Sequence, residues 1–126
     1  MLPVINRVRQ SADFARTVRS GVRSGRRNVV LYGTTTSGPG VSRVGFIVGK
    51  NVGNAVTRNI VKRRLRAAAS VWLTTCPSGF DVVVRALPVA ADSDFDSLQR
   101  DFSAGVGTVV RKLERVTDRG GQGSVS

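Results

Sequence analysis

The sequence predicts an α+β fold in which helices pack against one small, mixed, four-stranded sheet. Segments with apolar residues at helical spacing alternate with short Val-rich segments, in the order helix, three strands, helix, strand, helix. A helix that connects two strands of one sheet implies a parallel pair, so the sheet is expected to be mixed. A chain of 126 residues with 40% apolar content fits a single domain with a modest core. We therefore expect a two-layer sandwich without internal repeats.

The first predicted element is a short helix over residues 12–20. Ser11 is a suitable cap for it, Asp13 falls in its first turn, and Gly21 ends it. Three strands are predicted next, over residues 22–26, 27–34 and 42–49. The stretch TTTSGPG between the last two strands is typical of a turn or loop.

A long helix, a central strand and a last helix make up the rest of the chain. Asn54 is the predicted N-cap of the long helix, which should end near residue 75, before Pro77. Residues 80–86 (FDVVVRA) contain three consecutive valines, as expected of a strand covered on both faces. The last helix should begin near Ser93, with apolar positions at Phe95, Leu98, Phe102, Val106, Val109 and Leu113. The domain is predicted to span residues 1–117, followed by a disordered Gly- and Ser-rich tail at 118–126.

The net charge of +12 is extreme for this length and is unevenly distributed. Residues 1–70 contain fourteen Arg or Lys and a single acid, Asp13, whereas residues 71–126 contain six basic and seven acidic residues. Phosphates are the usual partner of such a positive field. The surface that meets a partner is therefore expected in the first seventy residues.

The long helix separates its charges from its apolar residues. Asn59, Lys62, Arg63 and Arg66 follow the spacing i, i+3, i+4, i+7 and share one face. On a different arc, Val61, Leu65, Ala68 and Trp72 repeat that spacing and form a face that can be buried. Arg64 falls outside the basic face, where the pattern leaves it open as a solvated or sheet-edge residue. Three cations and an amide on an anchored helix are suited to binding a polyanion.

Little in the sequence supports an active site. Histidine is absent, and Cys76 is the only cysteine, which excludes an internal disulfide or a zinc cluster of several thiolates. Two of the three acids at positions 92, 94 and 96 are expected to cap the last helix and favour its dipole, an interpretation preferred over metal binding. Residues 49–53 lack a phosphate-loop pattern. No segment resembles a signal peptide or a membrane span. These observations favour a binding protein in the cytoplasm.

Residues 53–66 (GNAVTRNIVKRRLR) closely resemble the signature of the bacterial ribonuclease P protein subunit. The resemblance covers residues 6 to about 113 in the order and spacing of that family. Further matching positions are Asn6, Arg7, Asp13, Phe14, Arg19, Gly21, Tyr32, Arg43, Val44, Gly45, Val48, Lys50 and the strand at 82–84.

The resemblance implies a ribosomal-protein-like sandwich with a left-handed crossover, which binds a large catalytic RNA. In that family the RNA uses Mg²⁺ to remove the 5′ leader of precursor tRNA, and the protein has no catalytic residues of its own. The implied RNA-binding residues are Lys50, Asn51, Asn54, Arg58, Asn59, Lys62, Arg63 and Arg66. The implied cleft for the leader involves Phe14, Val18 and Tyr32, since aromatic side chains stack on bases.

The chain departs from the family pattern at a few positions. Val18 stands where many members have a second aromatic residue, and Gly49 and Asn51 replace the commoner Ser and Lys around Lys50. From the residues alone, Phe14 and Tyr32 remain open as core residues, and whether the protein itself binds a metal is undetermined. The alternative functions are a structural ribosomal-type RNA-binding protein, a nuclease that acts by itself, and a DNA-binding regulator.

Overall fold

The computed structural model describes residues 2–36 and 40–125, with side chains up to residue 115. Its elements are a short 3₁₀ turn η1 (Val4–Asn6), α1 (Ser11–Ser20), β1 (Val22–Gly25), β2 (Val29–Thr35), β3 (Arg43–Ile47), α2 (Ala55–Thr75), β4 (Phe80–Ala86), a second 3₁₀ turn η2 (Pro88–Asp92) and α3 (Phe95–Val125). The order of helices and strands confirms the α+β prediction, and the two 3₁₀ turns are additions to it.

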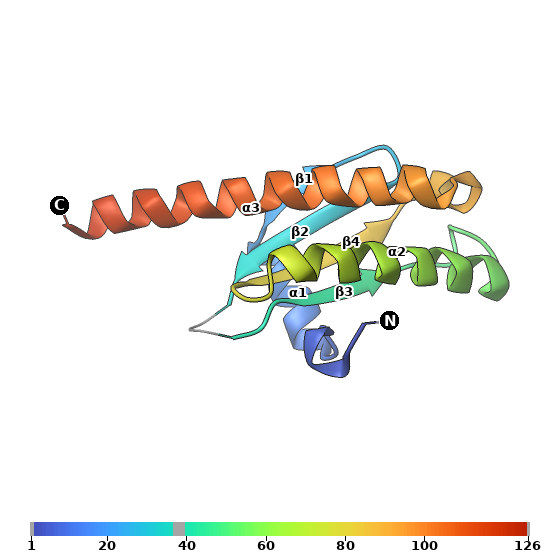
Figure 1. Cartoon of the computed structure of the whole chain (residues 1–126), viewed down its shortest axis with the longest axis horizontal. Helices are drawn as coiled ribbons and strands as arrows, with labels where there is room; N and C mark the ends of the chain where they lie inside the picture. The colour runs from blue at the N-terminus through green and yellow to red at the C-terminus, as the bar shows by residue number, and fades with distance from the viewer. Residues whose placement is uncertain (1, 37–39, 126) are drawn as a thin grey trace.

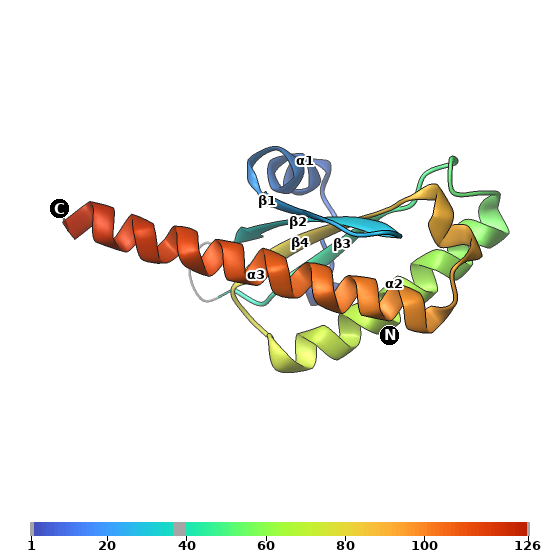
Figure 2. The same cartoon turned by 90° about the horizontal axis from the view of Figure 1, so that it is seen from above.

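The four strands form one mixed sheet in the order β1-β2-β4-β3. β1 and β4 pair antiparallel with β2, whereas β3 pairs parallel with β4, and α2 is the helix that connects this parallel pair. The two views show α1 on one face of the sheet and α2 and α3 on the other (Figures 1 and 2). β3 is an edge strand. On its outer side, an isolated parallel bridge pairs Val44, near the start of the strand, with Arg7 of the N-terminal segment.

The main core lies between the sheet and the α2–α3 layer. The valines at 82, 83 and 84 are fully buried, which confirms β4 as a strand covered on both faces. From α2 the core receives Val61 and Leu65, and from α3 it receives Leu98, Phe102, Val106, Val109 and Leu113. α3 also contains Gly105, where an added Cβ would lie 2.4 Å from Cδ1 of Leu31. This glycine, unfavourable for an isolated helix, lets α3 approach β2 closely.

The structure corrects the predicted cap of the first helix. Ser11 lies inside α1, and Gln10 occupies the N-cap without a side-chain hydrogen bond. The carbonyl of Gln10 accepts from the backbone N–H groups of Asp13 and Phe14, so the helix begins one residue earlier than predicted. At the other end Gly21 is the C-cap, as expected.

The last helix begins at Phe95, close to its predicted start near Ser93. It continues to Val125, so the predicted domain boundary at residue 117 does not coincide with the end of a helix. The proposed disorder of residues 118–126 stays a prediction, and Ser126 lies outside the described residues.

Candidate nucleic-acid interface

Helix α2 is held rigidly against the core. The side-chain oxygen of Asn54 accepts from the backbone N–H of Thr57 at 2.9 Å, which confirms the predicted N-cap. Val61 and Leu65 are almost completely buried, and Trp72 meets Phe102 of α3 edge to face, with 6.4 Å between ring centroids. A cap and a buried face fix both the start and the rotation of the helix. Its opposite face is consequently presented in one orientation.

The predicted RNA-binding residues lie on the solvent side of α2 and in the segment that leads into it. Lys50, Asn51, Asn54, Asn59, Arg63 and Arg66 are exposed, and Arg58 and Lys62 are half-buried. Within the part of the chain whose side chains are described, none of these cations forms an ion pair with an acid. We call these eight residues the basic face. Its charge is uncompensated and open to an anionic partner.

Arg58 differs from its neighbours because part of its guanidinium group is enclosed. Its Nε atom is buried and has no hydrogen-bond partner among the described residues. A buried donor without an acceptor costs free energy, and a phosphate or base oxygen placed beside it would remove that cost. Arg58 therefore offers a buried donor that an incoming acceptor could satisfy.

A cleft of about 570 Å³ lies between α1, the edge strand β3 and α2. Phe14 and Val18 line it, as the resemblance implied, together with Ser11, Ala15, Phe46, Ile47, Val48, Lys62 and Arg85. Phe14 lies directly on the edge strand because Gly45 has no side chain there. A Cβ at that position would be 2.6 Å from Cε1 of Phe14. The half-buried Phe14 ring is thus both packed and accessible from the cleft.

The third predicted cleft residue, Tyr32, is not among the residues that line the cleft. Tyr32 lies on β2, and its ring faces the guanidinium group of Arg85, which is 5.8 Å from the ring centroid. Arg85 itself lines the cleft. Tyr32 is therefore connected to the cleft only indirectly, through its cation–π contact with the Arg85 side chain. Sequence reasoning missed Arg85 and Phe46. The available signal for Arg85 was a cation directly after the three valines of β4.

A narrower groove of about 190 Å³ connects the cleft to the basic face. Lys62 and Arg66 of α2 line one side, and Arg7 and Arg9 of the N-terminal segment line the other. The groove also contains Phe14 and has no acidic lining residue. The basic face and the cleft are therefore parts of one continuous cationic surface that crosses the open edge of β3.

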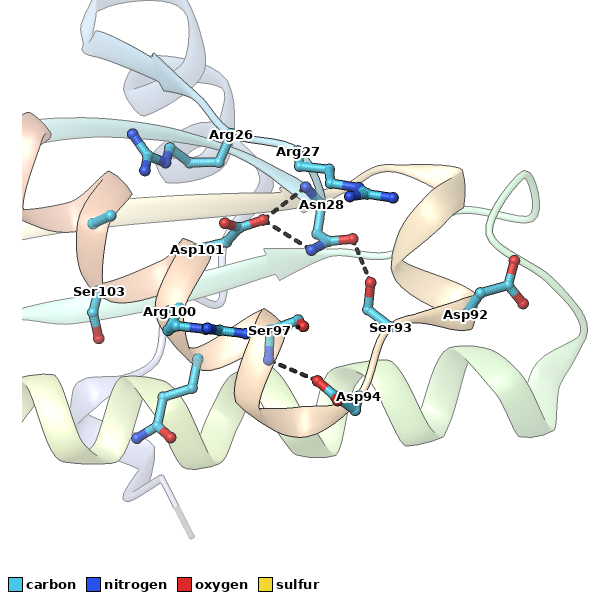
Figure 3. A pocket seen from close by; sticks show the side chains of 12 residues that line it. Arg26, Arg27, Asn28, Asp92, Ser93, Asp94, Ser97, Arg100, Asp101 and Ser103 are labelled. Atoms are coloured by element: carbon cyan, nitrogen blue, oxygen red, sulfur yellow. Dashed lines mark hydrogen bonds between the residues drawn. The ribbon is translucent and has the colours of Figure 1, made fainter.

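A larger polar pocket of about 1100 Å³ at the start of α3 is of a different kind (Figure 3). Its lining includes Arg26, Arg27 and Arg100 but also Asp92, Asp94 and Asp101, so its charges are balanced. One oxygen of Asp101 accepts from both the backbone and the side-chain nitrogen of Asn28, each at 2.9 Å, and Asn28 accepts from Ser93 (Figure 3). This network stabilises the fold and offers no net charge to a polyanion.

The same network explains the position of Arg64. Its Nη1 atom donates to the backbone oxygen of Ser93 at 2.7 Å. Arg64 is therefore neither a solvated nor a sheet-edge residue, the two readings that the pattern left open. It fastens α2 to the segment before α3 and helps to fix the direction in which the basic face points.

No metal site stands out in the described part of the chain, where no three His, Cys, Asp or Glu side chains gather. Asp94 caps α3 by accepting from the backbone N–H of Ser97 at 2.8 Å, and this hydrogen bond lowers the pKa of Asp94. Cys76 is half-buried, and its burial raises the pKa of the thiol, which disfavours the reactive thiolate. Among the described residues, no helix combines the length and the apolar composition that a membrane span requires.

Comparison with known proteins decides the family. The family model described as Ribonuclease P matches residues 2–110. The chain belongs to the ribonuclease P protein family. Among its relatives, the ribonuclease P protein components of Arthrobacter sp. (strain FB24) and Kocuria rhizophila are each 54% identical, over 113 and 112 residues. These alignments cover 90% and 89% of this chain, and 83% and 98% of the two relatives.

The fold agrees with the same family. The ribonuclease P protein of Staphylococcus aureus superimposes with a TM-score of 0.75 at 28% sequence identity, over 82% of this chain and 94% of that one. The ribonuclease P protein of Thermotoga maritima, at 24% identity, gives a TM-score of 0.69 and shares the fold. Family membership assigns this chain a role as a protein component of ribonuclease P in tRNA processing.

Proposed function

We propose that this protein binds the RNA subunit of ribonuclease P through the basic face, and that the RNA performs the cleavage. The observation that carries the proposal is a rigid, capped helix whose exposed cations have no acidic partner among the described residues. Release of counterions from the RNA makes such a contact favourable and sensitive to salt. The protein contributes binding and positioning, and Mg²⁺ bound by the RNA supplies the metal chemistry.

The cleft is the proposed site for the single-stranded 5′ leader of precursor tRNA. Phe14 offers a ring for stacking, and base–aromatic stacking contributes about 1–3 kcal/mol per base. Arg85 and Lys62 line the same cleft and can neutralise leader phosphates. Val18 stacks less well than an aromatic residue, so Phe14 carries a larger share of the stacking here. The groove with Arg7 and Arg9 would let one RNA surface continue from the leader to the catalytic RNA.

A cytoplasmic location is part of the proposal, as expected of a protein that acts with tRNA precursors. The main rival is a structural ribosomal-type RNA-binding protein. Such a protein would co-purify with ribosomal subunits and would leave the cleavage of precursor tRNA unchanged.

Reconstitution tests the proposed function directly. The protein is added to a bacterial ribonuclease P RNA and precursor tRNA at low Mg²⁺, and release of the 5′ leader is measured. We expect the protein to accelerate cleavage by the RNA, and the protein without RNA to be inactive. Cleavage by the RNA-free protein, or no acceleration at any protein concentration, would contradict the proposal.

Phe14→Ala tests the cleft separately. Holoenzyme made with this variant should lose preference for leader-bearing over mature tRNA, by about fivefold or more if one stacking contact is lost. Its affinity for the catalytic RNA should stay within about twofold, because Phe14 lies outside the basic face. Val71→Ala, an exposed apolar residue on the far side of α2, is a matched control. An equal loss for both tRNAs would show that Phe14 acts only as a core residue.

A further inference from the structure

A compact cluster of four charged side chains lies beneath α1. At its centre is Asp81, whose side chain is only 2% exposed. Arg43 donates to both oxygens of this carboxylate, from Nε at 2.9 Å and from Nη2 at 2.8 Å, and Arg16 donates at 2.9 Å. Asp13 completes the cluster, with its Oδ2 atom 3.3 Å from Nη1 of Arg43. Every salt bridge found among the described residues belongs to this cluster.

The cluster connects α1 to the sheet. Arg43 and Asp81 are paired at the starts of the parallel strands β3 and β4, and Asp13 and Arg16 come from α1. The hydrogen bonds that Arg43 donates to Asp81 are the largest cause of the raised pKa of Arg43. Pairs in which one partner is buried are screened by salt far less than surface pairs. The connection therefore persists under the ionic conditions in which RNA binds.

Few other interactions hold α1 in place. The helix has 10 residues, its N-cap side chain makes no hydrogen bond, and Thr17 is its only fully buried residue. The hydroxyl of Thr17 has no partner among the described residues. Helices of this length are marginal without tertiary contacts. The cluster is consequently a large part of what fixes the position of α1.

The two flanks of α1 have different tasks. Residues 13 and 16 are one turn apart on the flank that faces Asp81, whereas Phe14 and Val18 are one turn apart on the flank that lines the cleft. Because a helix moves as a rigid body, a shift or rotation that alters one flank alters the other. The charged cluster and the stacking ring are thus mechanically coupled without touching each other.

We propose that Asp81 and its three partners are positioning residues that set the place of α1, and thereby the shape of the cleft that holds the RNA leader. The proposal rests on the proposed function of that cleft. It also gives a purpose to Asp13, the only acid among the first seventy residues of a protein that otherwise favours cations there. None of the four residues is required to touch RNA.

A matched pair of variants on α1 separates positioning from general charge. Arg16→Gln removes a cation that belongs to the cluster, and Arg19→Gln removes an exposed cation of the same helix that makes no ion pair in the described structure. Dissociation constants of the holoenzyme for precursor and mature tRNA are measured for both. For Arg16→Gln we expect the precursor preference to fall about threefold to tenfold, the size of a partly exposed charge-assisted contact. For Arg19→Gln it should stay within about twofold of wild type.

Asp81→Asn tests the centre of the cluster and keeps the shape of the side chain. Amide hydrogen exchange should accelerate across α1 but not across α2, and affinity for the catalytic RNA should stay within about twofold. The precursor preference should fall more than in Arg16→Gln, because both arginines lose a charged acceptor. Should this variant fail to fold, Arg16→Lys decides instead, since its retained charge should restore most of the preference lost in Arg16→Gln.

The experiments distinguish a failure of the positioning proposal from a failure of the proposed leader-binding function of the cleft. Equal losses in Arg16→Gln and Arg19→Gln would overturn positioning and indicate general electrostatics. A folded Asp81→Asn with unchanged exchange in α1 and unchanged precursor preference would overturn it as well. If Phe14→Ala lowers the preference while these variants do not, the cleft stands and the positioning proposal falls. If Phe14→Ala has no effect, both fall.

Discussion

Helices α1 and α2 both contain arginines close to the proposed RNA surface, but they use them in opposite ways. On α2 the cations of the basic face have no acidic partner in the described structure, and buried apolar residues with an N-cap hold the helix. On α1 the cation at position 16 is bound to Asp81, and little apolar surface is buried. The difference shows that Arg16 is occupied in holding its own helix, whereas the cations of the basic face are left available because a cap and the core hold α2.

The two helices should also differ in how far the effect of a substitution reaches. α2 is supported by the main core, so loss of one surface charge leaves its backbone in place. α1 depends on polar contacts and on one aromatic ring, so a change beneath it should move the ring that faces the leader. Assembly with the catalytic RNA and recognition of the leader are therefore expected to be separable by mutation.

The largest effect is expected from Leu65→Ala, which removes core support of α2. Leu65 is completely buried. Such a substitution should lower the free energy of unfolding by about 2–5 kcal/mol. Chemical denaturation measures this change, and Ala67→Gly, on the exposed side of the same helix, should cost only about 1 kcal/mol. Equal costs at both positions would show that the core contributes less to α2 than we infer.

Gly45→Ala is the matching test on the side of α1. The added methyl group would collide with Phe14, which must move, and overpacking of this kind costs about 1–3 kcal/mol. Leader preference should fall in parallel, while affinity for the catalytic RNA stays near wild type. Binding titrations with precursor and mature tRNA, combined with denaturation, measure both effects. Unchanged leader preference would mean that the position of the ring is irrelevant.

Arg58→Ala combined with Arg63→Ala tests the basic face itself. Loss of two phosphate contacts should weaken assembly with the catalytic RNA by about tenfold or more, or about 1.4 kcal/mol. The dependence of the logarithm of affinity on the logarithm of salt concentration should become shallower by about one for each lost contact. Filter-binding titrations over a salt series provide both values. Unaltered affinity in a folded variant would refute the assignment of the basic face.

The smallest effect on stability is expected from substitutions at the N-caps of α1 and α2. Asn54→Ala removes a cap hydrogen bond and should cost about 1 kcal/mol of stability. Gln10→Ala removes a side chain that makes no such bond, so its cost should be only a few tenths of a kcal/mol. Denaturation of the two variants under one set of conditions gives the difference. Similar costs would remove the distinction between a capped and an uncapped helix.

Local patterns in the sequence were sufficient for most of the fold. β4 was predicted at its observed bounds, and the start and end of α2 followed from Asn54 as cap and from Pro77 beyond its end. The cap of α1 was wrong because local preference favours Ser as an N-cap, whereas the helix begins one residue earlier and has Gln10 as an N-cap without a side-chain hydrogen bond. The 3₁₀ turn η2 was missed because it has no periodic signal.

The proposed site was only partly predictable. The basic face could be recognised because its residues lie close together along the chain, in the first half of α2 and in the segment just before it. The cleft could not be completed in this way, since Phe46 and Arg85 come from strands almost forty residues apart and each looks like an ordinary strand residue alone. Tyr32 was assigned to the cleft by resemblance, whereas the structure places it behind Arg85.

The sequence by itself determined where positive charge would collect and which face of the long helix would carry it, because both depend on residues that are close along the chain. Tertiary structure alone decided which cations remain available. Arg16 and Arg43 look as free in the sequence as Arg63, yet Asp81 binds both from positions 65 and 38 residues away. Such ion pairs form only when folding brings distant strands and helices together, and no local pattern encodes that encounter.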